Sequence, residues 1–338
     1  MTATPMKTIH GIQYLRALAA LGVVLFHAAE RTGHHFAIGA AGVDVFFVIS
    51  GFIMWVISDR RPTRPLAFLK ERLRRIAPVY WLATMVMIGG GIAGLFPNLV
   101  LSLEHIVASL LFIPARSPSS GEIWPVLVQG WTLNFEMFFY VVFAASLMLP
   151  RHRRLPAMAA VFVSLVLLGL AIDTENALFL TYTRAVILEF VAGMIVAEFW
   201  LRGRIAGPGV GIVLVAGSFL GLAGLAVLRL PFDERILGPL AVMLVTGTLA
   251  LESDGWFRKW TLPTLLGDAS YSIYLWHTFA ISVVVKVAAV VGLNSAPTLL
   301  VALVAGTLAG IAAYFIIERP ITRRTRSRLP LNRVRPAS

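Results

Sequence analysis

The sequence predicts an all-α fold, a polytopic membrane bundle of about ten transmembrane helices. Hydrophobic residues make up 58% of the 338 positions and charged residues only 14%, and the mean hydropathy is +0.82. A soluble domain carries about 25% charged residues and lacks such long apolar runs. The alternation of polar and apolar residues that marks a membrane β-barrel is absent from the sequence.

Ten apolar segments approach or exceed the length needed to cross a bilayer, which is about 20 helical residues. A shorter apolar piece at 106–114 cannot span, so we expect a re-entrant or interfacial segment there. We interpret residues 1–320 as one membrane domain and 321–338 as a basic cytoplasmic tail. The expected spans are 9–29, 38–58, 75–95, 131–149, 155–172, 181–200, 208–229, 236–251, 265–290 and 298–317.

The basic residues fall mainly on one side of these spans. Of the 29 Lys and Arg, 22 lie in alternate loops or near the termini, at 7, 60–75, 151–154, 202–204, 258–259 and 319–335. Cytoplasmic loops of membrane proteins carry such an excess, so we expect both termini in the cytoplasm. The net charge of +12 is therefore interpreted as topology, and nucleic acid is not an expected partner.

The chain has no cysteine, which excludes disulfides, a thiolate nucleophile and any cysteine-based metal site. No spacing of histidine and acidic residues resembles a set of metal ligands, so we expect no metal site.

The first span contains a cation and an imidazole in an otherwise apolar run, R-A-L-A-A-L-G-V-V-L-F-H. Arg16 and His27 are eleven residues apart, about three helical turns, so they share one face and lie roughly 16 Å apart along the axis. A charged side chain inside a membrane helix is costly and indicates a functional site. The alternative is that Arg16 reaches a lipid headgroup and His27 caps the outer end.

Two carboxylates are expected near the depth of His27. Asp44 lies in G-V-D-V-F-F-V-I-S-G and Glu136 in W-T-L-N-F-E-M-F-F-Y, each near the outer end of a span that runs inward. A carboxylate beside an imidazole fixes its tautomer and raises its basicity, which suits a general base that takes a proton from a hydroxyl. The alternative is that each acid pairs with a buried cation and holds the bundle together.

The third span begins, at its cytoplasmic end, with R-L-R-R-I-A-P-V-Y-W. Arg72 and Arg75 are placed to bind phosphates, since the planar guanidinium binds two oxygens at once. Tyr80 and Trp81 could stack on a flat ring, and Arg16 could bridge this mouth and the His27 region. The plain alternative for the basic cluster is membrane topology.

Three further groups are secondary candidates. His277, in S-Y-S-I-Y-L-W-H, is expected near mid-membrane as a packing or pore-supporting residue. Arg184 and Glu189 are spaced to pair or to line the outer opening, and Glu318 could pair with a cytoplasmic arginine.

Taken together, these blocks resemble acyltransferase family 3, the integral-membrane acyltransferases that modify bacterial surface polysaccharides. The Arg-x10-His pair, G-V-D-V-F-F-V-I-S-G-F-I, R-L-R-R-I-A-P-V-Y-W and W-T-L-N-F-E-M-F-F-Y carry the resemblance, supported by S-Y-S-I-Y-L-W-H and I-E-R-P-I. The opening I-Q-Y-L-R-A and L-E-F-V-A-G-M resemble the ExoZ-like exopolysaccharide-production subgroup. Gln13 and Tyr14 depart from the commoner D-G-L-R-A form.

The resemblance implies ten helices in a bacterial inner membrane, a cytoplasmic acyl-CoA donor, no permanently bound cofactor, and a sugar hydroxyl of a surface glycan as acceptor. It makes His27 the essential histidine with Arg16 as its partner, Arg72 and Arg75 the cations near the donor, and Glu136 the acid of the fourth span. Many relatives carry a further hydrolase-like domain without counterpart here. We therefore expect this chain to act alone or with polysaccharide biosynthesis machinery.

Three functions stay open at this point. The first is an acyltransferase in which His27 acts as base or as an acyl carrier, with acetyl favoured over succinyl by the subgroup. The second is a flippase for a lipid-linked saccharide, which would move its substrate without acyl-CoA. The third is a non-catalytic scaffold, which gives no reason for the polar residues of the spans.

Overall fold

The computed structural model describes residues 8–61 and 63–327, and within these ranges the chain is helical with no strand. The predicted all-α membrane fold is thereby confirmed. Lys7 and most of the basic tail predicted at 321–338 lie outside the described residues. The elements are α1 His10–Arg31, η1 Ala37–Ala41, α2 Gly42–Arg60, α3 Pro65–Ile92, α4 Leu103–Leu110, η2 Val128–Gly130, α5 Trp131–Ser146, α6 Arg151–Ala171, α7 Ala177–Tyr182, η3 Ala185–Ile187, α8 Leu188–Leu201, α9 Pro208–Val227, α10 Glu234–Ser253, α11 Thr261–Val291, α12 Ser295–Ala313, the π-helix η4 Tyr314–Glu318 and α13 Arg319–Ser327.

Each of the ten expected spans coincides with a helix. Eight helices in the described ranges are long and apolar enough to cross a membrane, and the other two expected spans correspond to α5 and α8. These two have 16 and 14 residues and are each preceded by a short 3-10 turn. The short apolar piece expected between the third and fourth spans is α4, with only 8 residues.

The third span begins earlier than expected. We predicted it at 75–95, but α3 starts at Pro65, a residue suited to the first helical turn because its missing N–H needs no partner there. The basic residues from Lys70 to Arg75, which we placed in a loop, are therefore helical. We placed the boundary too late because we located spans by their apolar residues, and charged residues can be helical without being apolar.

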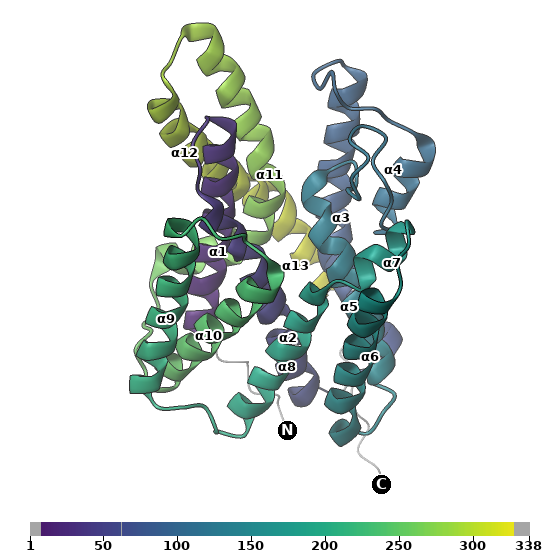
Figure 1. Cartoon of the computed structure of the whole chain (residues 1–338), viewed down its shortest axis with the longest axis vertical. Coiled ribbons are helices and arrows are strands. Elements are labelled where there is room, and N and C mark those ends of the chain that lie inside the picture. Colours follow the sequence, from purple (N-terminus) through teal and green to yellow (C-terminus); the bar gives the residue numbers. More distant parts are fainter. Residues whose placement is uncertain (1–7, 62, 328–338) are drawn as a thin grey trace.

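The helices pack in three groups (Figure 1). α11 lies against α1 and α12; α2 lies against α8 and α10, with α10 against α9; and α3 lies against α5. The α1–α11–α12 group rises on one side of the molecule, and α3 with α4, the α3–α4 group, rises on the other. The helices α2, α8 and α5 lie lower in the view of Figure 1.

Glycines explain a close contact between α2 and α8. A Cβ on Gly51 would overlap the carbonyl of Phe190, and one on Gly193 would overlap the carbonyl of Val48. Membrane helices approach closely through such small residues, since van der Waals packing replaces the hydrophobic driving force. The motifs V-I-S-G-F-I and V-A-G-M thus form one reciprocal backbone contact.

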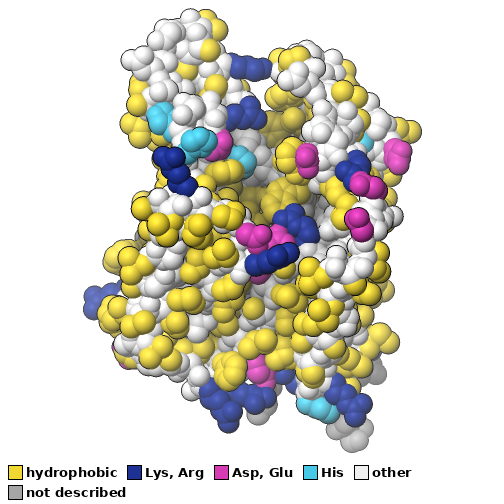
Figure 2. Space-filling view, viewed as in Figure 1, with side chains coloured by type: hydrophobic (Ala, Val, Ile, Leu, Met, Phe, Trp, Pro, Cys, Tyr) yellow, Lys and Arg dark blue, Asp and Glu magenta, His cyan; other side chains and the backbone are white. Residues whose placement is uncertain are grey.

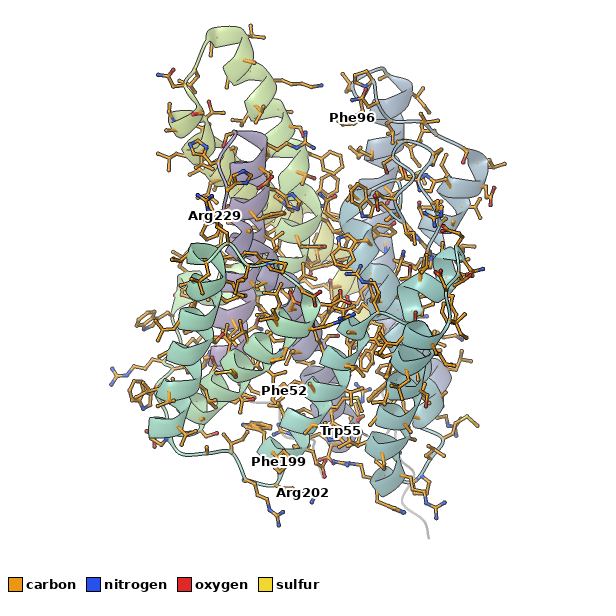
Figure 3. All side chains as sticks on the ribbon, in the orientation of Figure 1. Phe52, Trp55, Phe96, Phe199, Arg202 and Arg229 are labelled. Atoms are coloured by element: carbon orange, nitrogen blue, oxygen red, sulfur yellow. The ribbon has the colours of Figure 1, made fainter. Side chains whose placement is uncertain are left out.

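The two ends of the bundle differ in charge. We call the end formed by the segments at 63–64, 202–207 and 254–260 the inner end, and the opposite end the outer end. Figure 3 shows Arg202 at the inner end and Phe96 at the outer end, and Lys and Arg side chains gather at the inner end in Figure 2. There Arg151 of α6 donates to Glu198 of α8 (2.6 Å) and to Asp59 of α2 (2.8 Å), which ties three helices together.

Candidate active site

A cavity of about 840 Å³, including space open to solvent, lies between α1, α2, α3, α5 and α11. Much of its wall is apolar, contributed largely by α2 between Val43 and Met54. Pockets of this kind bind small molecules through apolar walls and a few placed polar groups. The polar side chains of the lining are Arg16, Ser50, Arg72, Arg75, Thr132, Glu136, Tyr140, Ser270, Tyr271 and Tyr274.

Three guanidinium groups come together in the part of the cavity toward the inner end. Arg16 of α1 is half-buried and donates to Ser270 (3.0 Å) and Gln13 (3.3 Å). Arg72 is buried and donates to Glu71 (2.9 Å). Arg75 has neither a hydrogen bond nor an ion pair with another residue that the structure describes. The cavity therefore offers one guanidinium group without a hydrogen-bond partner in the described chain beside two that are hydrogen-bonded to protein groups.

Helix geometry separates Arg75 from its neighbour Arg74. Both residues are exposed and lie in the same turn of α3, but only Arg75 lines the cavity. Consecutive residues on an α-helix point about 100° apart. The two arginines thus carry the same charge at nearly the same depth, Arg75 inside the cavity and Arg74 outside it.

Glu136 of α5 lies on the cavity wall with two hydroxyl donors. Ser50 of α2 donates to its Oε1 (3.2 Å), and Tyr140, one turn along α5, donates to the same oxygen. These bonds hold the carboxylate against α2. Ser50 comes directly before Gly51, so the close α2–α8 contact also sets the position of this donor.

Hydroxyl groups also mark the part of the cavity that lies toward the outer end. Tyr274 of α11 donates to the Gln129 carbonyl (3.1 Å) and lies 3.0 Å from the Thr132 hydroxyl. One turn inward, Tyr271 donates to the Ile76 carbonyl (2.8 Å) and joins α11 to α3. Both tyrosines line the cavity.

His27 lies beyond the cavity lining, next to a second histidine. Its ring centroid is 5.2 Å from that of His277, which in turn is 6.3 Å from the ring of Tyr274. The outer part of the cavity is therefore connected to His27 through two rings of α11. Figure 2 shows the outer half of the molecule hollowed between the α1–α11–α12 and α3–α4 groups, with histidine side chains on the α1 side.

The expected convergence of His27 with Asp44 and Glu136 does not appear in the structure. Glu136 bonds Ser50 and Tyr140, as described above, and Asp44 lies buried in the first turn of α2, where its carboxyl interacts with that of Glu189. No hydrogen bond joins His27 to either acid within the described ranges. Asp44 therefore faces Glu189 of α8 instead of His27 of α1.

Two other expected pairings also differ. Arg184 forms its ion pair with Glu234 of α10, not with Glu189, whose carboxyl interacts with that of Asp44. Glu318 accepts from Ser272 (2.6 Å) instead of binding an arginine directly. In each case the partner comes from a helix distant in sequence, which spacing alone does not reveal.

Tyr80 and Trp81 do not line the cavity. Tyr80 is fully buried and donates to the Ser109 carbonyl (3.1 Å), and its ring lies against Phe112. Trp81 is 39% exposed and donates to the Leu110 carbonyl (2.8 Å). Because α3 starts at Pro65, these aromatics fall in its middle turns, where they hold α4. The expectation that they stack on a ligand at the inner mouth is not supported by their position.

Several lining residues were missed in the sequence, although a signal existed for some. Tyr271 and Tyr274 are spaced by three residues in S-Y-S-I-Y-L-W-H, which places them on one helix face with His277, the residue of this motif that we did single out. Tyr140 follows Glu136 by four residues. Ser50 had no signal, since its role depends on the contact between α2 and α5. Among the residues described, no group of three or more His, Asp and Glu side chains could hold a metal ion.

The fold and site define a polytopic membrane protein with an internal cavity that is cationic toward one end and is followed by paired imidazoles at the other. The family model for acyltransferase family 3, described as an acyltransferase domain, matches residues 9–317. The chain belongs to this family, as its motifs predicted, and is a membrane acyltransferase.

Curated relatives agree with this assignment. The chain is 65% identical to the exopolysaccharide production protein ExoZ of Rhizobium meliloti (strain 1021) over 305 residues, 90% of this chain and 96% of that protein. It is 27% identical to the O-acetyltransferase OatA of Staphylococcus aureus (strain NCTC 8325 / PS 47) over 94% of this chain and 58% of OatA. It is 28% identical to the putative membrane-bound transacylase BcsY of Komagataeibacter xylinus, over 81% and 73% of the two chains. No solved structure matches the chain.

Proposed function

We propose that this protein transfers an acetyl group from cytoplasmic acetyl-CoA to a sugar hydroxyl of an exopolysaccharide or a related surface glycan. The observation that carries the proposal is the polarity of the cavity, with three guanidinium groups toward its inner end and His27 beyond its outer end. The acceptor class is supported by the relative named for exopolysaccharide production and the acetyl group by the relative named an O-acetyltransferase.

The donor occupies the inner part of the site in this proposal. The phosphates of CoA bind Arg75 and Arg72, and Arg16 lies further along the path of the pantetheine arm. Arginine is suited to phosphate because its fork donates two parallel hydrogen bonds to two oxygens. The apolar wall from α2 would accommodate the arm, which carries few charges. This arrangement requires the inner end to face the cytoplasm, in agreement with the excess of basic residues there.

The chemistry takes place toward the outer end. His27 takes the proton of the sugar hydroxyl while the oxygen of that hydroxyl attacks the carbonyl carbon of the thioester. The carbon–sulfur bond breaks, and the departing thiolate receives the proton, so that CoA leaves with a free thiol. A variant in which His27 carries the acyl group uses the same two reactants. General base catalysis of this kind contributes about 10²–10⁴-fold to the rate.

The membrane placement follows from the same arrangement. A multi-pass protein of the bacterial inner membrane, with both termini in the cytoplasm, meets acetyl-CoA at its inner end and a glycan at its outer end. The saccharide acceptor, the lipid bilayer and the polysaccharide biosynthesis machinery are the partners that this proposal requires.

The test is acetyl transfer by the purified protein in proteoliposomes. Radiolabelled acetyl-CoA and alkali-deacetylated exopolysaccharide oligosaccharides from the producing strain are the substrates, and alkali-labile label on the oligosaccharide is the product. We expect time-dependent labelling that requires the protein. Protein that binds no acetyl-CoA and transfers no label, yet moves a lipid-linked saccharide across the bilayer, would establish the flippase function instead.

A further inference from the structure

The histidine beside His27 has a fixed tautomer. His277 is fully buried, and its Nδ1 lies 2.9 Å from the carbonyl oxygen of Ile273. A carbonyl oxygen only accepts hydrogen bonds, so Nδ1 carries the proton and Nε2 presents a lone pair. This lone pair has no hydrogen-bond partner among the described residues.

An unpartnered buried nitrogen is uncommon, because leaving a buried acceptor without a donor is destabilising. At His277 the exception coincides with a second imidazole. The centroids of the two rings are 5.2 Å apart, which is close enough for ring nitrogens that face each other to reach a hydrogen-bond distance of about 3 Å, although the two side chains form no hydrogen bond in this structure. The charged groups that act on His27 are Glu30 and Arg31 of its own helix.

The surroundings of His277 restrict its movement. A Cβ on Gly306 of α12 would lie 3.3 Å from the Cβ of His277 and 3.2 Å from a methyl group of Val24 of α1. α12 therefore lies directly against the α1–α11 contact, where a side chain at position 306 would crowd both helices. The imidazole is thus held by its backbone bond to Ile273 and by the close packing of α12, with the ring of His27 beside it.

We propose that His277 is a positioning residue for acyl transfer, whose Nε2 accepts a hydrogen bond from His27 when the ring of His27 turns toward it during the reaction. That bond would place the proton of neutral His27 on the nitrogen facing His277 and leave the other nitrogen free to take the proton of the acceptor hydroxyl. This inference rests on the proposed function, because it assigns a role to His277 only if His27 is the base or acyl carrier.

Two amide substitutions separate this role from packing. H277Q places an acceptor near the position of Nε2, whereas H277N keeps a donor near Nδ1 that can bond Ile273 but loses the acceptor. We expect H277Q to retain a kcat at least tenfold above that of H277N. We also expect both variants to keep a KM for acetyl-CoA within threefold of wild type, because His277 does not line the cavity. A residue that only packs through its bond to Ile273 predicts the reverse order.

His105 provides a matched control. It is also buried, one ring nitrogen lies 2.7 Å from the Trp124 carbonyl oxygen, and the other has no partner within the described chain. It lies on α4, away from His27. H105Q and H105N should therefore have the same kcat as each other, and their pH profiles should match that of wild type. We expect H277N to shift the acidic limb of the kcat profile, since it changes the hydrogen bonding of His27.

The outcomes distinguish the two proposals. Equal kcat values for H277Q and H277N, the reverse order, or loss of acetyl-CoA binding in both would overturn the role of His277 and show it to be structural. If H27A itself retains wild-type transfer, the proposed function of His27 fails first. If H27A is inactive while both His277 variants are fully active, only the inference about His277 fails.

Discussion

Among the described residues that line the cavity, the charged side chains are Arg16, Arg72, Arg75 and Glu136, and the three cations lie toward the inner end. Tyr274 lines the other end of the cavity, and the region beyond it contains the two imidazoles of His277 and His27. In the proposed function this difference separates binding from chemistry. The three cations would hold the polyanionic donor, and His27, which is distant from those three cations, would act as the base.

Replacement of His27 should have the largest effect. We expect H27A to lower transfer by about 10²–10⁴-fold, the contribution of a general base, with acetyl-CoA binding within threefold of wild type. Rates are measured as labelled oligosaccharide formed and binding by equilibrium dialysis. H35A is the control, because His35 is exposed and pairs with Glu30 outside the cavity. Transfer by H27A at the wild-type rate would show that the reaction does not depend on an imidazole at the outer end.

The inner end is tested by the adjacent arginines. R75A should weaken acetyl-CoA binding about 10- to 100-fold, since a hydrogen bond to a charged group is worth about 1.5–3 kcal/mol. R74A removes the same charge outside the cavity and should change the Kd by less than threefold. Isothermal titration of the two variants gives the comparison. Equal losses in both would mean that only the general positive potential matters.

The smallest effect is expected at the aromatics excluded from the cavity. W81F removes the hydrogen bond to Leu110, which is worth about 1 kcal/mol, and should lower the melting temperature slightly. The Kd for acetyl-CoA should stay within twofold of wild type, because Trp81 does not line the cavity. If W81F weakened the binding of acetyl-CoA tenfold, Trp81 would contact the donor after all, and the donor site would extend beyond this cavity.

The sequence was sufficient for the ten long helices and for the charged residues that line the cavity. Ten apolar segments indicated ten helices, since length and hydropathy are local properties. Arg16, Arg72, Arg75 and Glu136 were recognised because charge in a membrane segment is unusual, and all four line the cavity.

The pairings could not be predicted in the same way. Depth along the membrane was the only coordinate available from the sequence, and it placed Asp44 level with His27 without showing that Asp44 faces Glu189. Rotation about each helix axis and the early start of α3 were invisible to that reasoning. His277 was expected only as a supporting residue, because its neighbour on α1 becomes apparent only when α1 and α11 are packed together.

The most direct test of the account is cysteine protection in oriented membranes, which is possible because the chain has no cysteine of its own. I53C places one thiol on the cavity wall, and R202C places one at the inner end outside the cavity. In inside-out vesicles a membrane-impermeant maleimide should label both, and acetyl-CoA should protect only I53C. Labelling of I53C only from the outer face, or at a rate that acetyl-CoA does not change, would contradict a donor site at the inner end.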